Sequence, residues 1–473
     1  MAVDPRTPCI VGVARRTWRQ QPAPEPLAMW EELTRAAAAD AVSADAVRDI
    51  QSLQVVYCQS WEYDDPCGRL ADRLGADPKH RAYSGIGGSV PVALVGDAAG
   101  AMARGELDLA LVVGGEALAT RRRLPAPPWS FAPEQATPFP ITLDPGEAAN
   151  GIYQAYLTFA LLDTARRAGL GLAVADHREA LGRLLAPLSR VAAAHPEHAW
   201  FPTARPADEI VTVTAANRMV ATPYTKLMTA VMDVDMAAAV LLATEERADR
   251  MGVPDHQRVY LRGLGVGEEP PAMAARPDLG RSPALAAAGR AALRGHHIDD
   301  VAHLDLYSCF ASSLDFARDA LGITDGRGLT VTGGLPYHGG PGSNYCAHSL
   351  AAMAGTLRSD PGSLGLVTGI GMHMTHHAAS LWSTLPGEFV PATAAEPLPA
   401  STVSSGVGGT GTVATFSTTW SREGPSWTAL ICDLPDGTRC YARLEEPPAE
   451  DDDLVGTTVT LAPGRRGAVT ATR

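Results

Sequence analysis

Lysine is almost missing from this chain. The 473 residues include 39 lysines and arginines, but only Lys79 and Lys226 are lysines. Schiff-base chemistry therefore has just these two amines to use. Positive charge is also in the minority, because 52 acidic residues leave a formal net charge of −13. Such a surface repels polyanions, so general binding to nucleic acid or to an anionic membrane is not expected.

Cysteine is sparse and has no recognisable spacing. The seven residues are Cys9, Cys58, Cys67, Cys309, Cys346, Cys432 and Cys440. An odd number without a CxxC pair is not expected to form a disulfide framework or a structural zinc site. We expect reduced thiols and no metal, as in a cytoplasmic protein.

Long apolar runs are also missing. The longest apolar segment, residues 107–119, is interrupted by Asp108 and Glu116, so no membrane insertion is expected. The apolar segment after Met1 is closed by Arg15 and Arg16 and is too short for a signal peptide. We therefore predict a soluble, cytoplasmic protein.

Apolar runs alternate with helical patterns in the first half of the chain. The clearest unit is a strand at 81–83, a loop at 84–89, a helix at 91–104 and a strand at 107–113. This order predicts an α/β domain with a largely parallel sheet. The rhythm breaks at 116–218, where Pro125, Pro127, Pro128, Pro138, Pro140 and Pro145 precede a helical stretch at 148–193. We interpret 116–218 as a lid or loop insertion.

A second α/β pass follows, over about 259–383. Two successive passes indicate a duplicated unit. After residue 388 a linker rich in Pro, Ser and Gly leads to short strands that predict a small all-β barrel, with a hairpin at Pro435-Asp-Gly437. The expected domains are 1–255, 256–388, and 389–473 for the linker and barrel.

Two predictions concern the surface of this β-domain. Phe416, Trp420 and Trp427 are interpreted as core rather than as a platform for a ligand. Asp451–Asp453 are interpreted as a solvated turn. The domain either caps a ligand pocket or covers a surface through which two copies associate.

Four motifs follow one another along the chain. They are Gly87-Gly-Ser-Val-Pro91, Val113-Gly-Gly-Glu116, Asp305-Leu-Tyr-Ser-Cys-Phe310, and the glycine-rich loop from Gly333 to Gly342. In order and spacing they resemble the thiolase superfamily, over about residues 6–385. The segment Asn217-Arg-Met with Pro223-Tyr-Thr-Lys226 is similar to the family segment that closes the N-terminal half.

The resemblance implies a duplicated βαβαβαββ thiolase fold, stacked as a five-layer αβαβα core with a lid insertion. It also implies a pocket for the pantetheine arm of an acyl-CoA. The C-terminal β-domain is similar to the OB-like domains appended to some thiolase-like proteins.

The chain departs from the thiolase pattern wherever the Claisen reaction needs a residue. The nucleophilic Cys of the family falls on Gly87 or Gly88, with Ser89 the nearest hydroxyl and interpreted mainly as a helix cap. The oxyanion His falls within Gly339-Gly-Pro341, with His338 two residues earlier. The second Cys, the base, falls near 368–371, which holds no thiol. Ordinary thiolase activity is therefore not expected.

One branch of the superfamily also lacks the Cys. It consists of aldolases acting on CoA thioesters, which place a Tyr in the motif matched here by Tyr307 and a second Tyr in the later loop, matched more loosely by Tyr345. The resemblance implies Tyr307, Tyr345 and His338 as catalytic candidates. The expected pocket residues are Gly87, Gly88, Ser89, Cys309, Gly339, Gly340 and His377.

Three hypotheses follow. The protein is an enzyme acting on a CoA thioester by C–C cleavage or acyl transfer; or a non-catalytic acyl-CoA-binding or scaffold protein; or a ketosynthase-like transferase using Ser89 or Cys346. Each takes coenzyme A thioester as substrate or ligand, with no redox nucleotide. The expected assembly is a homodimer or a monomer.

Overall fold

The computed structural model describes residues 3–124, 144–392 and 396–473. The prolines from 125 to 140, on which part of the lid prediction rests, lie outside the described residues. Within the described ranges, no helix combines the length and apolarity needed to cross a bilayer. No cluster of three or more metal-ligating side chains occurs there either.

A nine-stranded mixed sheet forms the core, in the order β3-β2-β4-β7-β1-β8-β11-β10-β9. Its N-terminal strands are β1 (Pro8–Thr17), β2 (Ser52–Val55), β3 (His80–Tyr83), β4 (Leu109–Ala117) and β7 (Asp235–Thr244). β2 runs parallel to β3 and β4, whereas β7 is antiparallel to β4 and β1. Every residue of β4 and β7 is buried, which explains their nearly continuous apolar sequences.

The C-terminal half repeats the pattern with one strand fewer. Its strands are β8 (Val259–Glu268), β9 (Val301–Asp305), β10 (Leu364–Gly371) and β11 (His376–Ser383). β9 and β10 are parallel, and β11 is antiparallel to β10 and β8. The two halves join where Cys9 and Ile10 of β1 pair with Tyr260 and Val259 of β8.

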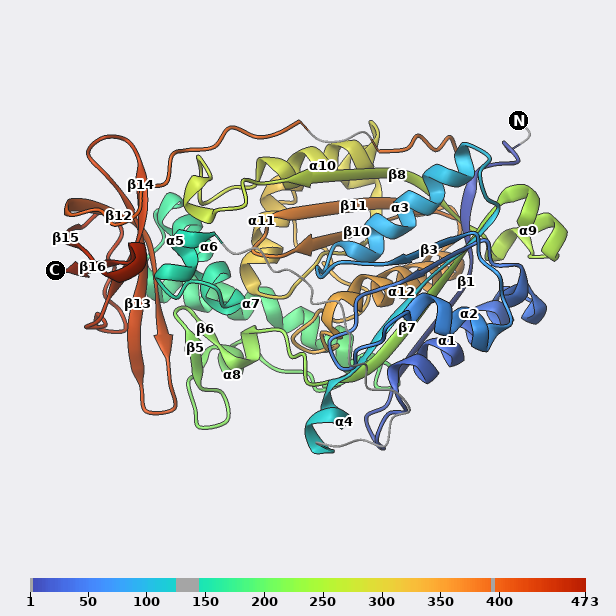
Figure 1. Ribbon diagram of the computed structural model, residues 1–473, viewed down its shortest axis with the longest axis horizontal. Coiled ribbons are helices and arrows are strands. Elements are labelled where there is room, and N and C mark those ends of the chain that lie inside the picture. The colour runs from blue at the N-terminus through green and yellow to red at the C-terminus, as the bar shows by residue number, and fades with distance from the viewer. Residues whose placement is uncertain (1–2, 125–143, 393–395) are drawn as a thin grey trace.

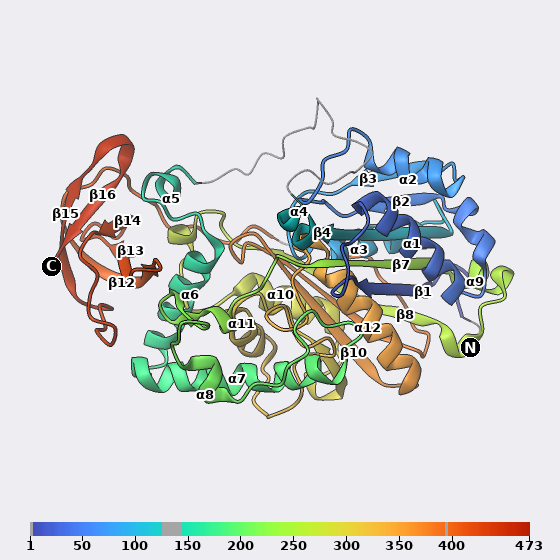
Figure 2. The ribbon, with the colours of Figure 1, turned by 90° about the horizontal axis from the view of Figure 1, so that it is seen from below.

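Helices complete five layers (Figures 1 and 2). α1 (Pro26–Asp40) and α2 (Pro66–Leu74) cover the N-terminal strands, while α10 (Pro283–Leu293) and α11 (Ala311–Leu321) lie on the C-terminal side. Between them, α3 (Val90–Ala103) and α12 (Tyr345–Ser359) contact strands of both halves. The αβαβα stack is confirmed. The ends of the two central helices therefore lie where the halves face each other.

The insertion after β4 is mostly helical in its described part. It contains α4 (Leu118–Arg123), α5 (Pro145–Ala149), α6 (Ala155–Gly169), α7 (Val174–Ala194), α8 (Ala207–Val211), and the short strands β5 (Met219–Ala221) and β6 (Tyr224–Thr225). α9 (Glu245–Met251) follows β7. Figure 1 shows α5 and α6 between the sheet and the C-terminal domain.

The C-terminal domain is a five-stranded barrel, as predicted. Its strands are β12 (Gly409–Trp420), β13 (Pro425–Asp433), β14 (Arg439–Leu444), β15 (Thr458–Pro463) and β16 (Val469–Thr472). They close in the order β12-β13-β14-β16-β15-β12, with β14 parallel to β16. Closure leaves no open sheet edge among these five strands.

The barrel contacts the insertion. β5 and β6 form a hairpin that pairs with β12 through Ala221 and Thr419. Asp451 and Asp453 of the acidic turn are exposed, as expected of a solvated turn. Asp453 accepts a hydrogen bond of 2.7 Å from the buried Arg167 of α6, because a buried guanidinium needs a counter-charge.

The aromatic residues of the barrel differ in burial. Phe416 is 4% exposed and belongs to the barrel core. Trp420 and Trp427 are half-buried, and Trp427 packs against the guanidinium of Arg443 at 4.3 Å. The core interpretation therefore fits Phe416 better than either tryptophan.

Candidate active site

A cavity of about 400 Å³ lies at the N-terminus of α3, between the two halves. Its described lining comes from three regions: the loop before α3, the insertion, and the loops of the C-terminal half. The lining residues are Gln59, Ile86, Gly87, Gly88, Tyr153, Gln154, Ala155, Tyr156, Phe159, Val220, Thr229, Ala230, Met232, Tyr307, Cys309, Phe310, Leu335, Gly340, Gly342, Ser343, Ile370, Met372 and His373. Five of the predicted site residues are among them, namely Gly87, Gly88, Tyr307, Cys309 and Gly340.

The Tyr307 hydroxyl packs directly against the backbone of Gly88 in this cavity. A β-carbon built on Gly88 would lie 2.0 Å from the Tyr307 hydroxyl oxygen and 2.5 Å from the carbonyl oxygen of Ile370. The tyrosine hydroxyl thus occupies the space that a side chain at residue 88 would need. Burial raises the pKa of Tyr307 well above its usual value, so the phenol stays protonated near neutral pH and acts as a hydrogen-bond donor.

The N-terminus of α3 contributes backbone amides to the same region. The Gly87 amide donates a 3.0 Å hydrogen bond to Ser343 Oγ. Ser89 stands at the N-cap, but its hydroxyl makes no capping hydrogen bond, so the expected cap interaction is not formed. Ser89 is buried and is not among the described residues that line the cavity.

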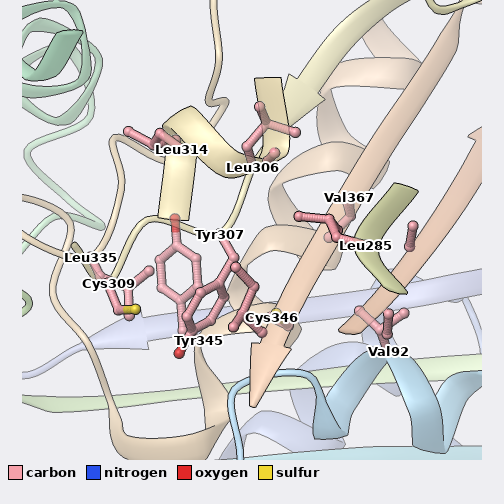
Figure 3. Close-up of a cluster of buried hydrophobic side chains, with 14 of the residues drawn as sticks. Val92, Leu285, Leu306, Tyr307, Cys309, Leu314, Leu335, Tyr345, Cys346 and Val367 are labelled. Carbon is pink, nitrogen blue, oxygen red and sulfur yellow. The ribbon is translucent and has the colours of Figure 1, made fainter. Parts of the chain in front are cut away.

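Tyr345 lies beside Tyr307 but faces another environment. The two rings pack edge to face with centroids 5.7 Å apart (Figure 3). The Tyr345 hydroxyl lies 2.6 Å from Thr332 Oγ1 and 3.3 Å from Asp305 Oδ1. It is fully buried and is not among the described lining residues. Burial and the nearby Asp305 raise the pKa of Tyr345.

Asp305 organises the loop around Tyr345. Its Oδ2 accepts hydrogen bonds from the hydroxyls of Thr330 and Thr332 and from the amides of Val331 and Thr332. Its Oδ1 accepts from Ser349 at 2.8 Å. This buried carboxylate holds the segment between α11 and α12, so that the Tyr345 hydroxyl is part of an internal hydrogen-bond network.

His338 also points away from the cavity lining. It is fully buried, and its Nε2 lies 3.4 Å from Nδ1 of His348. Burial lowers the pKa of both imidazoles well below 6.5. Next to His338, a β-carbon on Gly339 would lie 2.7 Å from the sulfur of Met236, so Gly339 faces the core.

His377 is similarly enclosed. Its Nε2 donates to the Met374 carbonyl at 3.1 Å and lies 3.2 Å from Ser282 Oγ. Burial lowers its pKa to about 3. Neither His377 nor Gly339 is among the described residues of the cavity lining.

The cavity contains an imidazole that was not among the site predictions, His373. It sits in the turn between β10 and β11, where the flanking Met372 and Met374 both have positive φ, 54° and 57°. Side chains other than glycine rarely adopt this conformation, and such strain clusters at functional sites. The thiolase resemblance places the catalytic base near residues 368–371, at the end of β10. The position of His373 just beyond this strand is the sequence feature that could have identified it.

His373 is held by charged neighbours. Its Nδ1 lies 3.8 Å from Oε2 of the buried Glu147, and its carbonyl accepts a 2.6 Å hydrogen bond from Arg276. Burial tends to raise the pKa of Glu147, but His373, the Met273 amide and the Tyr441 hydroxyl outweigh it and lower that pKa. Glu147 is therefore ionised, and its Oε2 faces the imidazole of His373.

The two cysteines near the cavity are poor nucleophiles. Burial raises the pKa of Cys309 to about 12 and that of Cys346 well above 9.0. Cys346 is fully buried, with its sulfur 3.6 Å from the Thr368 carbonyl. All seven cysteines are free and buried. The thiolate that covalent catalysis requires is scarce at both positions.

Comparison with known proteins identifies the family. No protein-family model matches the chain, and no curated protein sequence does. The crystal structure of a monomeric SCP2-thiolase-like protein type 1 from Mycobacterium smegmatis shares 34% identity over 100% of both chains, with a TM-score of 0.86. The chain belongs to the SCP2-thiolase-like proteins. The thiolase resemblance and the appended barrel are thereby confirmed.

More distant structures share the fold with this SCP2-thiolase-like protein. The Ltp2-ChsH2(DUF35) aldolase is 18% identical, with a TM-score of 0.63 over 80% of this chain and 98% of its own. The dimeric peroxisomal thiolase of Saccharomyces cerevisiae is 14% identical, with a TM-score of 0.56 over 81% and 98%. The acetyl-CoA acetyltransferase of Syntrophomonas wolfei is 14% identical, with a TM-score of 0.59 over 81% and 100%.

Proposed function

We propose that this SCP2-thiolase-like protein binds a β-hydroxyacyl-CoA in the cavity and cleaves its Cα–Cβ bond without a covalent acyl-enzyme. The contact between Gly88 and Tyr307 carries the proposal. Where the family places a nucleophilic thiol, this chain places a protonated phenol, which can donate a hydrogen bond but has little nucleophilic power.

Tyr307 and the N-terminus of α3 polarise the thioester in this proposal. The oxygen of the thioester carbonyl accepts a hydrogen bond from the Tyr307 hydroxyl, and the helix dipole favours the negative charge that develops there. The stabilisation is largest in the enolate, where the oxygen carries a full charge. This differential binding is what lowers the barrier.

His373 is the base. Its imidazole takes the proton of the β-hydroxyl, the Cα–Cβ bond breaks, and a carbonyl forms at the former β-carbon. The electron pair of the broken bond goes to Cα and gives the enolate of the shortened acyl-CoA. The same imidazole then returns the proton to Cα, so the products are a ketone or aldehyde and a shorter thioester.

The lining of the cavity supports an apolar acyl group. Most of its described residues are aliphatic or aromatic, and the rim residues Tyr153 and Met232 are about half exposed, at 49% and 52%. The solved structure named an aldolase shares this fold. An apolar pocket with a few polar groups is the usual form of a small-molecule site.

The test uses β-hydroxyacyl-CoA substrates of several chain lengths with wild type, Tyr307→Phe and His373→Gln. We expect carbonyl product from wild type and a rate at least about 100-fold lower in each variant, the usual effect of losing a general acid or base. Tyr345→Phe is the matched control and should retain the rate. Equal rates for wild type and Tyr307→Phe would contradict the proposal.

Two other outcomes identify other functions. Release of CoA without a carbonyl product indicates acyl transfer. Calorimetric binding of acyl-CoA without any turnover indicates a non-catalytic acyl-CoA-binding protein. Both contradict C–C cleavage as the reaction while retaining the cavity as the binding site.

We propose that the protein works as a monomer. The relative with 34% identity is described as monomeric, and here the small barrel lies at one end of the core (Figure 2). Sedimentation velocity tests this assembly. A dimer that persists at micromolar concentration would overturn it.

A further inference from the structure

One tyrosine of the barrel faces the core of the molecule rather than the inside of the barrel. Tyr441 is the sole tyrosine between residues 389 and 473. Its neighbours in β14, Cys440 and Ala442, pack in the barrel core, whereas Tyr441 packs with the core of the thiolase fold. This alternation is the normal period of a strand. It directs a phenol towards the insertion.

The Tyr441 hydroxyl is part of a chain of contacts that ends in the cavity. It donates a 2.7 Å hydrogen bond to Oε1 of Glu147 on α5 and accepts one of 2.8 Å from the Ala274 amide. Oε1 of Glu147 also accepts from the Met273 amide at 2.9 Å. The other carboxylate oxygen, Oε2, lies 3.8 Å from Nδ1 of His373.

We propose that Tyr441 and Glu147 are positioning residues for His373. The inference rests on the proposed function, since it explains how the base is oriented. A carboxylate facing Nδ1 keeps the proton on that nitrogen and leaves the Nε2 lone pair available to a substrate hydroxyl. The barrel thereby supplies a structural part of the site although none of its residues lines the described cavity surface.

The arrangement of elements favours this role over simple packing. Glu147 and Tyr441 are 2% and 1% exposed, and 294 residues separate them in the chain. A buried carboxylate is costly unless its oxygens are occupied. Here one oxygen is held by two donors, which fixes the other towards the imidazole. A second cavity of about 600 Å³ also borders Glu147 and His373.

Other charged groups face this pair. Asp144 caps α5, and Arg276 donates to the His373 carbonyl. Glu269 follows β8 and accepts from Ser282 at 2.7 Å, and His376, which begins β11, lies 3.3 Å from Glu268. In this set, Glu147 is the carboxylate paired with His373.

The first test needs no activity. Long-range ¹H–¹⁵N spectra of the full-length protein labelled with ¹⁵N-histidine report the tautomer of each imidazole, and His373→Gln assigns the signal of His373. We expect the Nδ1-protonated form in wild type. Its fraction should fall clearly in Glu147→Gln and less in Tyr441→Phe.

Ser417→Ala is the matched control. It removes a buried hydroxyl that donates to the Thr222 carbonyl at 2.8 Å across the same barrel interface, without touching Glu147. The His373 tautomer should remain as in wild type. An unchanged tautomer in both Glu147→Gln and Tyr441→Phe, or an equal change in Ser417→Ala, would overturn the inference.

Kinetics gives a second readout. In Glu147→Gln we expect kcat to fall about tenfold with little change in KM, because the imidazole loses its orientation while the cavity that binds the substrate is unchanged. Loss of cleavage in Tyr307→Phe and His373→Gln with no effect in Glu147→Gln or Tyr441→Phe refutes the positioning role alone. If wild type shows no cleavage, the tautomer still decides this inference.

Discussion

The surroundings of Tyr307 and Tyr345 differ sharply although their rings touch. Tyr307 borders a cavity and takes the space of a missing side chain at Gly88. Tyr345 is enclosed by Thr332, Asp305 and His338. The same side chain therefore has two uses within a few ångströms. What separates them is the set of hydrogen-bond partners around each hydroxyl.

The difference shows how this fold divides structure from chemistry. The Tyr345 hydroxyl, Asp305 and residues 330–332 hydrogen-bond one another, so that side of α12 behaves as a buried network that stabilises the segment between α11 and α12. On the other side, Tyr307 and His373 line the cavity. Variants should accordingly lose stability on one side and activity on the other.

Asp305→Ala should have the largest effect on stability. It leaves several buried hydroxyl and amide donors of residues 330–332 without their acceptor. We expect a loss of about 3–5 kcal/mol in the free energy of unfolding, at the upper end for single substitutions. Urea denaturation measures it. Asp360→Ala, which removes an exposed carboxylate, is the control and should leave the midpoint nearly unchanged.

Acid should destabilise the fold through three buried imidazoles, two of which, His338 and His348, lie on the Tyr345 side. The pKa values of His338, His348 and His377 are lowered in the folded state. Below about pH 6.5 these imidazoles are protonated in the unfolded chain but not in the folded chain. The free energy of unfolding therefore decreases as the pH is lowered. Each imidazole contributes about 1.4 kcal/mol per pH unit.

Denaturation midpoints between pH 8 and 4.5 measure how steeply stability depends on pH. His348→Gln should reduce by one the number of protons taken up on unfolding. A stability that stays constant from pH 7 to 5 would show that these imidazoles are protonated in the folded state.

Gly88→Ala tests the contact on the cavity side. Its β-carbon would clash with Tyr307 and with the Ile370 carbonyl, so we expect a loss of about 1–3 kcal/mol from overpacking. Gly355 of α12 has no neighbouring atom within 4 Å of such a β-carbon. Gly355→Ala should therefore stabilise the protein by about 0.5–1 kcal/mol. Calorimetric melting compares the two, and a neutral Gly88→Ala would contradict the described packing.

Tyr345→Phe and Tyr307→Phe sharpen the comparison with the smallest expected changes in stability. Loss of the Tyr345 hydroxyl should cost about 1 kcal/mol, because Thr332 loses a hydrogen-bond partner. Loss of the Tyr307 hydroxyl should cost less stability and, under the proposed function, lower the cleavage rate at least about 100-fold. Denaturation and product analysis on the same two preparations measure both effects. A larger loss of stability in Tyr307→Phe together with a larger loss of activity in Tyr345→Phe would exchange the roles of the two tyrosines.

Much of the fold could be predicted from sequence patterns. The alternation of apolar runs and helices indicated two α/β passes, and the short strands with Pro435-Asp-Gly437 indicated the barrel. The motif positions led to Gly88 and Tyr307. These features are local, or depend on an order along the chain that the sequence displays directly.

The direction of individual side chains could not be predicted in the same way. Tyr345 and His338 come from the expected loops, but Asp305 and His348 hold them on the inner side. Glu147, His373 and Tyr441 come from three distant segments, and a spacing pattern does not show that tertiary packing brings them together. The pairing of β5 with β12 was missed for the same reason.

The seven buried thiols can report which parts of the molecule unfold first. A thiol reagent reacts only when a segment opens, because a buried thiol is shielded from the reagent. Three thiols lie in the N-terminal half, two in the C-terminal half, and the neighbouring Cys432 and Cys440 in the barrel. Mass spectrometry of modified peptides would therefore reveal the order in which the three units open. It would also show whether a ligand slows the labelling of Cys309, which borders the cavity.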